Sequence, residues 1–138
     1  MGVAVGVGVA VGVGVAVVKG FIDRLERTPE GPYVVVDFKT GSSMESKNTI
    51  RDNIQMNVYC LAVKNKFGKL PARASLLYLK KRKMVDYVPD PQHFEQQQDR
   101  LAGIIAQVLN ESFEAQPSYD ACLFCGYHEL CEAMEIKD

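Results

Sequence analysis

The sequence predicts an α/β fold in which a small mixed β-sheet is flanked by helices. Two strand-like runs near the N-terminus are separated by a segment rich in turn-forming residues. Two longer segments repeat apolar residues at the helical period, and a third apolar, strand-like run lies between them. The order of elements is therefore strand, strand, helix, strand, helix.

The first two runs are expected to form a hairpin around residues 28–32. With this loop, pairing begins at Arg27 with Tyr33 and reaches Asp23 opposite Asp37. Directly opposed residues have Cβ atoms roughly 4.5–5.5 Å apart, so these two carboxylates need a proton or a cation between them. Ligation by oxygen alone suits Mg²⁺ or Mn²⁺. A surface hairpin with scattered charges is the alternative.

The second strand ends in the tripeptide Asp37-Phe38-Lys39. Side chains alternate along a strand, so Asp37 and Lys39 point to the same face. An acid and an amine side by side at the mouth of a sheet are the parts from which a metal-dependent phosphodiesterase is built. The tripeptide alone is weak support, and the neighbouring elements strengthen it.

Residues 48–67 are predicted to form one amphipathic helix that stops at Gly68. Gln55 and Tyr59 are four residues apart and therefore lie on one face. On a helix packed against the hairpin, this pair would orient the lysine and touch nucleic acid. A boundary glutamine and a half-buried packing tyrosine are the alternative. The apolar positions at helical spacing are Ile50, Ile54, Val58, Leu61 and Ala62.

A basic run separates the expected strand 73–79 from the short run 84–88. It is Lys80-Lys81-Arg82-Lys83, and it would either meet phosphates or form a solvated hairpin turn. A second helix is expected over residues 91–113, and a short one over 128–134.

Three segments together resemble the RecB-like branch of the PD-(D/E)XK nuclease superfamily. They are G-F-I-D-R-L-E, V-V-V-D-F-K-T-G and Q-M-N-V-Y, and the similarity extends over about residues 18–134. The resemblance implies a restriction-endonuclease-like core and metal-dependent exonuclease activity on DNA. It favours the nuclease domain of UvrD-type or AddAB-type helicase–nucleases in DNA recombination and repair, related to CRISPR-associated RecB-like exonucleases. DNA and a helicase domain or subunit are the implied partners.

The resemblance also implies roles for individual residues. The two aspartates and the carbonyl of the residue after the second would hold Mg²⁺ or Mn²⁺. The lysine would position or help deprotonate the attacking water. The glutamine would orient the lysine or the water, and the tyrosine would contact DNA. In this sequence the residues are Asp23, Asp37, Phe38, Lys39, Gln55 and Tyr59.

The C-terminal cysteines admit three interpretations. Cys122, Cys125 and Cys131 resemble a tail that holds a 4Fe–4S cluster together with one upstream cysteine. No cysteine precedes Cys60, which is expected to be a small buried thiol. With His128, the three cysteines form a Cys3His set suited to structural Zn²⁺. The third interpretation is a vestigial cysteine motif that binds no metal and is packed by aromatic and aliphatic side chains.

Residues 1–17 form a repetitive Val/Gly/Ala tract that does not resemble part of a globular nuclease. We interpret the tract as designed or as a stand-in, and place the nuclease domain at 18–138 with a cysteine-rich tail at 116–138. The resembling family usually carries a further metal ligand ahead of the Asp23 strand, and none is present here. The tract is too rich in glycine for a membrane span and lacks the basic start of a signal peptide, so a cytoplasmic protein without a membrane segment is expected.

Composition indicates one domain with a modest core, because the chain has 138 residues and 47% hydrophobic content. A net charge of −1 argues against gripping DNA through bulk electrostatics. Two other functions stay open: a degenerate nuclease fold that binds DNA or a helicase partner, and a zinc-stabilised interaction module.

Overall fold

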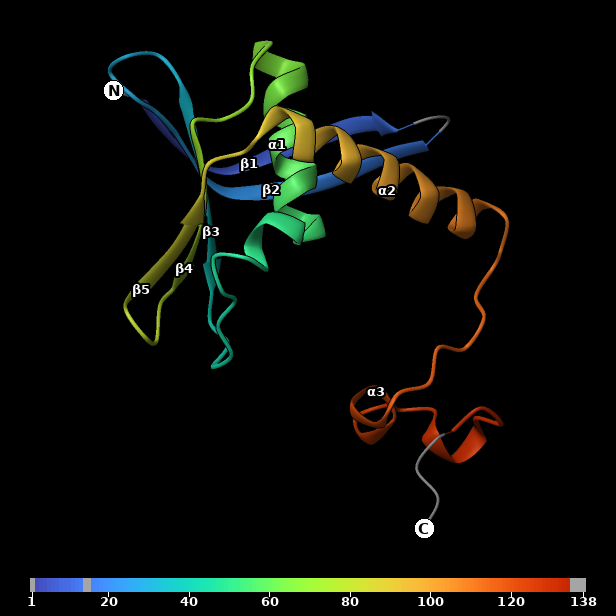
Figure 1. The fold of residues 1–138 in the computed structure, drawn as a ribbon. Coiled ribbons are helices and arrows are strands. Elements are labelled where there is room, and N and C mark those ends of the chain that lie inside the picture. The colour runs from blue at the N-terminus through green and yellow to red at the C-terminus, as the bar shows by residue number, and fades with distance from the viewer. Residues whose placement is uncertain (1, 14–15, 135–138) are drawn as a thin grey trace. The chain divides into compact units, whose positions relative to one another are not determined.

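A computed structural model describes residues 2–13 and 16–134 of the chain (Figure 1). It separates into two compact units that divide after Ile105. The first unit holds the sheet, and the second holds the cysteine-rich tail.

The first unit is built on one mixed five-stranded sheet with the strand order β1-β2-β3-β4-β5. β3 and β4 are parallel, and the other neighbours are antiparallel. Helices flank the sheet, which confirms the predicted fold class (Figure 1). The strands are β1 Gly2–Val13, β2 Ala16–Arg27, β3 Tyr33–Lys39, β4 Arg73–Tyr78 and β5 Lys83–Tyr87.

The predicted register of the β2–β3 hairpin is confirmed from Arg27–Tyr33 to Arg24–Val36, and the predicted Asp23–Asp37 pair is not part of the ladder. Arg27 pairs with Tyr33, and the ladder continues without a bulge to Arg24 with Val36. The next position on each strand is an aspartate, so the ladder stops just where the two carboxylates would face each other. Turn chemistry and strand alternation were sufficient to predict this pairing because the hairpin is local in sequence.

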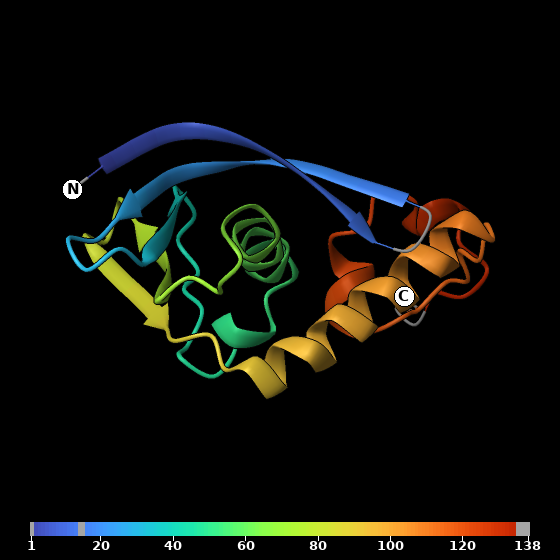
Figure 2. The same ribbon diagram turned by 90° about the horizontal axis from the view of Figure 1, so that it is seen from above.

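The Val/Gly/Ala tract forms β1 and the first residues of β2. β1 and β2 make a long, curved ribbon that passes over α1 (Figure 2). Val7 and Val13 pack against the hydrophobic core. The tract therefore contributes to the packing of the first unit.

The helix predicted over residues 48–67 is interrupted near its start. A 3₁₀ turn, Ile50–Asp52, precedes α1, Ile54–Phe67. Asn53 between them has extended backbone angles, and its side chain accepts a hydrogen bond from the Met56 N–H at 3.0 Å. Asparagine at an N-cap satisfies an N–H that the helix leaves free, which starts a new helix here. Gly68 ends α1 with a φ of 79°, as predicted.

The expected amphipathic character of α1 is wrong. Every residue from Met56 to Val63 is buried, so the helix has no solvent face along its middle. The β1–β2 ribbon covers one side of α1, and Phe94 of α2 packs into the same core. The polar residues of this stretch therefore have partners inside the protein: the Asn57 amide, for example, donates to the Arg51 and Asn53 carbonyls.

α2 spans Pro91–Leu109 and is shorter than the predicted 91–113. Glu111, just beyond it, has a φ of 53°, a left-handed conformation that a helix cannot continue through. Phe94 and Leu101 are its buried residues. No helix within residues 2–13 and 16–134 has both the length and the apolar character needed to cross a membrane.

The second unit contains a short helix that was not predicted, α3 Tyr119–Leu123. The Ser118 hydroxyl caps it by accepting from the Ala121 N–H at 3.2 Å. The helix predicted over 128–134 is only a 3₁₀ turn, His128–Leu130. The 3₁₀ turn ends at Cys131, whose backbone is extended, so no regular helix follows.

Candidate active site

The predicted site residues come from three elements of the first unit. Asp23 lies in β2, Asp37 and Lys39 lie at the end of β3, and Gln55 and Tyr59 lie in the first turns of α1. The sheet and the helix bring them together, because α1 packs against β3.

The Gln55 amide connects three of the other side chains. The Gln55 Oε1 accepts from the Lys39 Nζ at 2.6 Å, and its Nε2 donates to the Asp37 Oδ1 at 3.0 Å. The same Nε2 donates to the Tyr59 hydroxyl at 2.8 Å. Both ends of the Gln55 amide are therefore used, which holds the lysine and the aspartate in one arrangement.

Asp37 and Lys39 also form an ion pair, with 2.8 Å between Oδ2 and Nζ. The Asp37 side chain is almost fully buried, whereas about a third of the Lys39 side chain is exposed. Within the tripeptide, the carboxylate is therefore buried and the amine is partly exposed to solvent. This places the two groups on one face, as strand alternation predicts.

Asp23 joins the site through the backbone of the tripeptide. Its Oδ2 accepts from the Phe38 N–H at 2.7 Å. The N–H and C=O of a residue in an antiparallel ladder point to the same edge of the strand. The Phe38 carbonyl therefore faces the β2 side of β3, beyond Arg24–Val36, the last pair of the β2–β3 ladder.

Burial dominates the electrostatics of Asp37. Desolvation raises the pKa of its carboxyl above the ordinary value, Lys39 opposes this rise, and the neighbouring Asp23 adds to it. The attraction of Lys39 thus offsets only part of the cost of burying the ionised Asp37 carboxylate. Asp37 Oδ2 is buried, and within the described residues its partner is the Lys39 ammonium of the ion pair.

These groups fit a divalent cation. Two carboxylates and the Phe38 carbonyl would supply the oxygen ligands that Mg²⁺ and Mn²⁺ prefer, and the buried Asp37 Oδ2, paired in the described residues with Lys39 alone, would be one of them. Across residues 2–13 and 16–134 no cluster of three or more acidic, histidine or cysteine side chains is formed. A cation here would accordingly complete its shell with the backbone and with water.

Tyr59 is placed differently from the expectation. Only 5% of its surface is exposed, which argues against the expected contact with DNA. Desolvation, more than any charge, raises the pKa of its phenol, so the hydroxyl stays protonated at neutral pH. Its contact is with Gln55, and it therefore acts on the site through that amide.

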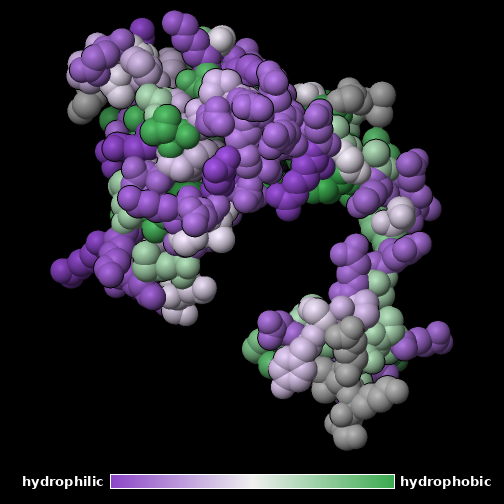
Figure 3. All heavy atoms as spheres, viewed as in Figure 1, coloured by the Kyte–Doolittle hydropathy of each residue, from purple (hydrophilic) through white to green (hydrophobic). Residues whose placement is uncertain are grey.

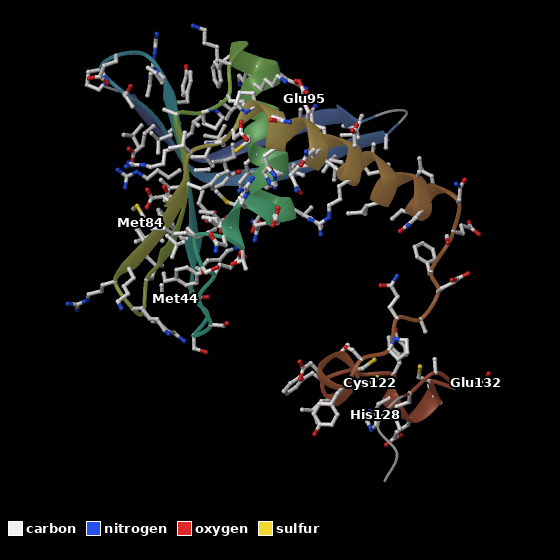
Figure 4. All side chains as sticks on the ribbon, viewed as in Figure 1. Met44, Met84, Glu95, Cys122, His128 and Glu132 are labelled. Carbon is white, nitrogen blue, oxygen red and sulfur yellow. The ribbon has the colours of Figure 1, made fainter. Side chains whose placement is uncertain are left out.

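Sequence reasoning missed a groove beside Lys39. The loop after β3 is fixed from both sides, since the Glu45 N–H donates to the Tyr78 hydroxyl at 2.8 Å and the Asn53 amide donates to the Glu45 carboxylate at 2.5 Å. Met44 of this loop lies close to the end of the sheet (Figure 4). The groove has a volume of about 500 Å³ and is lined by Lys39, Gly41, Ser43, Met44, Glu45, Thr49 and Tyr78. The polar run after the tripeptide was the signal that could have found it.

The cysteines are free thiols in the described structure. Cys122 is buried and Cys125 and Cys131 are partly buried, and they are not gathered with His128 into a metal-binding group within the described part of the second unit. Cys60 belongs to the core of the first unit, where burial raises the pKa of its thiol to about 12. The interpretation of Cys60 as a small buried thiol is confirmed.

Comparison with known proteins gives both a family and a fold. A search of curated proteins found no match. The chain is similar to a solved structure described as the crystal structure of SSO0001, with a TM-score of 0.60 at 17% sequence identity. The alignment covers 95% of this chain and 61% of the other, so the chain spans less than two thirds of that protein. The sequence profile of the PD-(D/E)XK nuclease superfamily matches residues 2–132, and the chain therefore belongs to this superfamily.

Proposed function

We propose that this chain is a metal-dependent nuclease that hydrolyses phosphodiester bonds in DNA. Membership of the superfamily implies nuclease activity and DNA binding, and its nucleases typically use Mg²⁺ or Mn²⁺. The observation that carries the proposal is the network in which Gln55 joins Asp37 and Lys39, with Asp23 beside them.

Asp23, Asp37 and the Phe38 carbonyl are the groups that would hold the cation. A bound Mg²⁺ or Mn²⁺ lowers the pKa of a water ligand and stabilises charge on the scissile phosphate. Gln55 holds one oxygen of Asp37 by a hydrogen bond and Lys39 holds the other by an ion pair, so the carboxylate is kept in one position.

Lys39 is the residue that would act on the reacting atoms. Its ammonium lies within hydrogen-bond distance of both Asp37 and Gln55 and is partly exposed toward the groove. From there it can orient the attacking water and neutralise the developing oxyanion of the phosphate. Gln55 is a positioning residue in this scheme, and Tyr59 holds Gln55.

We place the chain in the RecB-like branch, as an exonuclease domain associated with a helicase. The support is the sequence of the three motifs and their spacing over residues 23–59. The domain would comprise residues 18–138, with 116–138 as its tail, and the Val/Gly/Ala tract ahead of it adds β1 and the start of β2 to the same sheet. An iron–sulfur cluster or Zn²⁺ in that tail would require Cys122, Cys125 and Cys131 to move together on binding.

One observation favours a second candidate, a degenerate nuclease fold that binds DNA without cutting it. The described site offers two carboxylates, Asp23 and Asp37, and no third acidic side chain within residues 2–13 and 16–134 joins them. This candidate predicts DNA binding without hydrolysis.

The test is digestion of linear single-stranded and double-stranded DNA with Mg²⁺ or Mn²⁺. Lys39→Ala is expected to lose at least about 100-fold in turnover, as removal of one oxyanion-stabilising group does. Lys66→Ala, at an exposed position of α1, is the matched control. Thermal unfolding of each variant shows that the fold is retained.

Turnover of Lys39→Ala at the wild-type rate would overturn the site assignment. DNA binding by wild type without any hydrolysis would favour the degenerate fold instead.

A further inference from the structure

The basic run 80–83, here termed the basic turn, begins beside the candidate site. Lys39 pairs with Tyr78 at the end of the parallel β3–β4 ladder, and the Leu79 N–H donates to the Lys39 carbonyl at 3.0 Å. Lys80 is the next residue. The basic turn therefore leaves the sheet from the backbone that supports the candidate catalytic lysine.

The basic turn has a defined conformation. Tyr78 pairs with Lys83 across the hairpin, and the Arg82 N–H donates to the Leu79 carbonyl at 3.3 Å. Arg82 has a φ of 51°, the left-handed conformation that closes the turn. A closed turn of this kind holds its four side chains close together instead of dispersing them along a strand.

These four side chains carry charge that the rest of the described protein does not neutralise. All four residues are exposed, and within residues 2–13 and 16–134 none of them takes part in an ion pair. Hydrophilic side chains project from the tip of the β4–β5 hairpin (Figures 3 and 4). The net charge of the chain is −1, so this is a local concentration of positive charge on a nearly neutral protein.

The groove beside Lys39 is lined by Tyr78, which lies next to the start of the basic turn in sequence. Tyr78 lines the groove and is two residues from Lys80, while Lys39 lines the groove from the other strand. A volume of about 500 Å³ accommodates a group of the size of one nucleotide. A strand with one phosphate at Lys39 would thus have its neighbouring phosphates within reach of the hairpin tip.

We propose that the basic turn binds backbone phosphates of the DNA strand whose scissile phosphate lies at Lys39, and so holds that strand on the groove side of the site. This inference rests on the proposed function and adds the element that binds the substrate. The contacts carry no sequence preference, because lysine and arginine at phosphates read the backbone alone.

The test compares two variants that each remove three positive charges. Lys80→Gln/Lys81→Gln/Lys83→Gln changes the basic turn, and Lys19→Gln/Lys66→Gln/Lys69→Gln changes exposed lysines elsewhere in the first unit. Binding of fluorescent oligothymidylate and of duplex DNA is measured in EDTA, where cleavage is suppressed. Each phosphate contact contributes about 0.7 to the salt slope for single strands and about 0.9 for duplex.

The turn variant is expected to lower the single-strand salt slope by about 2, whereas the control keeps the wild-type slope. Between 50 and 200 mM salt, wild type would then lose about 20-fold more affinity than the turn variant. In the cleavage assay the turn variant should raise KM and leave kcat unchanged. The fall in salt slope caused by the turn variant is measured for single-stranded and for duplex DNA. The form whose slope falls by the amount expected for three phosphate contacts is the form that the basic turn binds.

Equal slopes for wild type and the turn variant would overturn the inference, as would the absence of DNA binding by wild type. Because binding is measured without cleavage, a protein that binds through the basic turn but does not cut keeps this inference and loses the proposed function. If the wild-type protein cuts DNA and the turn variant has the wild-type salt slope, the proposed function is kept and this inference is lost.

Discussion

Tyr59→Phe separates two roles for the buried tyrosine. The change removes one hydroxyl and keeps the ring that fills the core. In the structure the hydroxyl accepts from Gln55 at 2.8 Å and is shielded from solvent. We therefore expect the variant to loosen Gln55, and through it Lys39 and Asp37, without changing any surface that DNA can touch.

The size of the effect follows from the bond that is lost. A neutral hydrogen bond contributes about 0.5–1.5 kcal/mol, which corresponds to about 2- to 13-fold in rate if all of it is felt in the transition state. The loss should appear in kcat, since Gln55 keeps its direct bonds to Asp37 and Lys39. It should remain well below the loss expected for Lys39→Ala.

Steady-state hydrolysis of linear DNA measures kcat and KM for Tyr59→Phe beside Tyr87→Phe. Tyr87 lies close to the core, and its hydroxyl is 3.6 Å from the Cys60 sulfur, so the control removes a hydroxyl away from the site. The control should lose stability without losing kcat. An increase in KM with unchanged kcat for Tyr59→Phe would refute the reasoning, because it would mean that the hydroxyl contacts DNA.

Two further predictions concern ionisation. Because desolvation raises the pKa of Asp37, the folded state holds this proton more tightly than the unfolded state, and the stability it confers is lost as pH rises through the folded pKa. Denaturant unfolding in EDTA between about pH 4 and 8 should therefore show wild type losing stability relative to Asp37→Asn; the opposite trend would contradict this. Cys60, with a pKa of about 12, should resist thiol reagents in the native protein while Cys125 and Cys131 react, and fast labelling of all cysteines would contradict its burial.

Local patterns predicted the parts of the site that are close in sequence. Turn residues and alternation were enough for the hairpin register from Arg27 to Arg24, because the loop length sets which residues face each other. The spacing of Asp37 and Lys39 determines that they share a face of β3. The four-residue spacing of Gln55 and Tyr59 likewise brings their side chains together on a helix, and they are hydrogen-bonded.

Errors arose where packing overrides local preference. Periodicity suggested a helix with a solvent face, whereas α1 is covered by the β1–β2 ribbon and is buried from Met56 to Val63. The start of the helix moved because the Asn53 side chain caps Met56, a choice that depends on the preceding 3₁₀ turn. Tyr59 is also buried, which periodicity within the helix did not predict.

The sequence by itself determined the identity of the chemical groups and their short-range geometry. Only the tertiary structure decided what surrounds them: β4 pairs in parallel with β3 across more than thirty intervening residues, and this places Tyr78 and the basic turn next to Lys39. Such pairing depends on the burial of apolar faces from distant segments, which periodicity within one segment does not encode. The groove and the burial of Asp37 therefore emerge only when the strands and α1 are packed together.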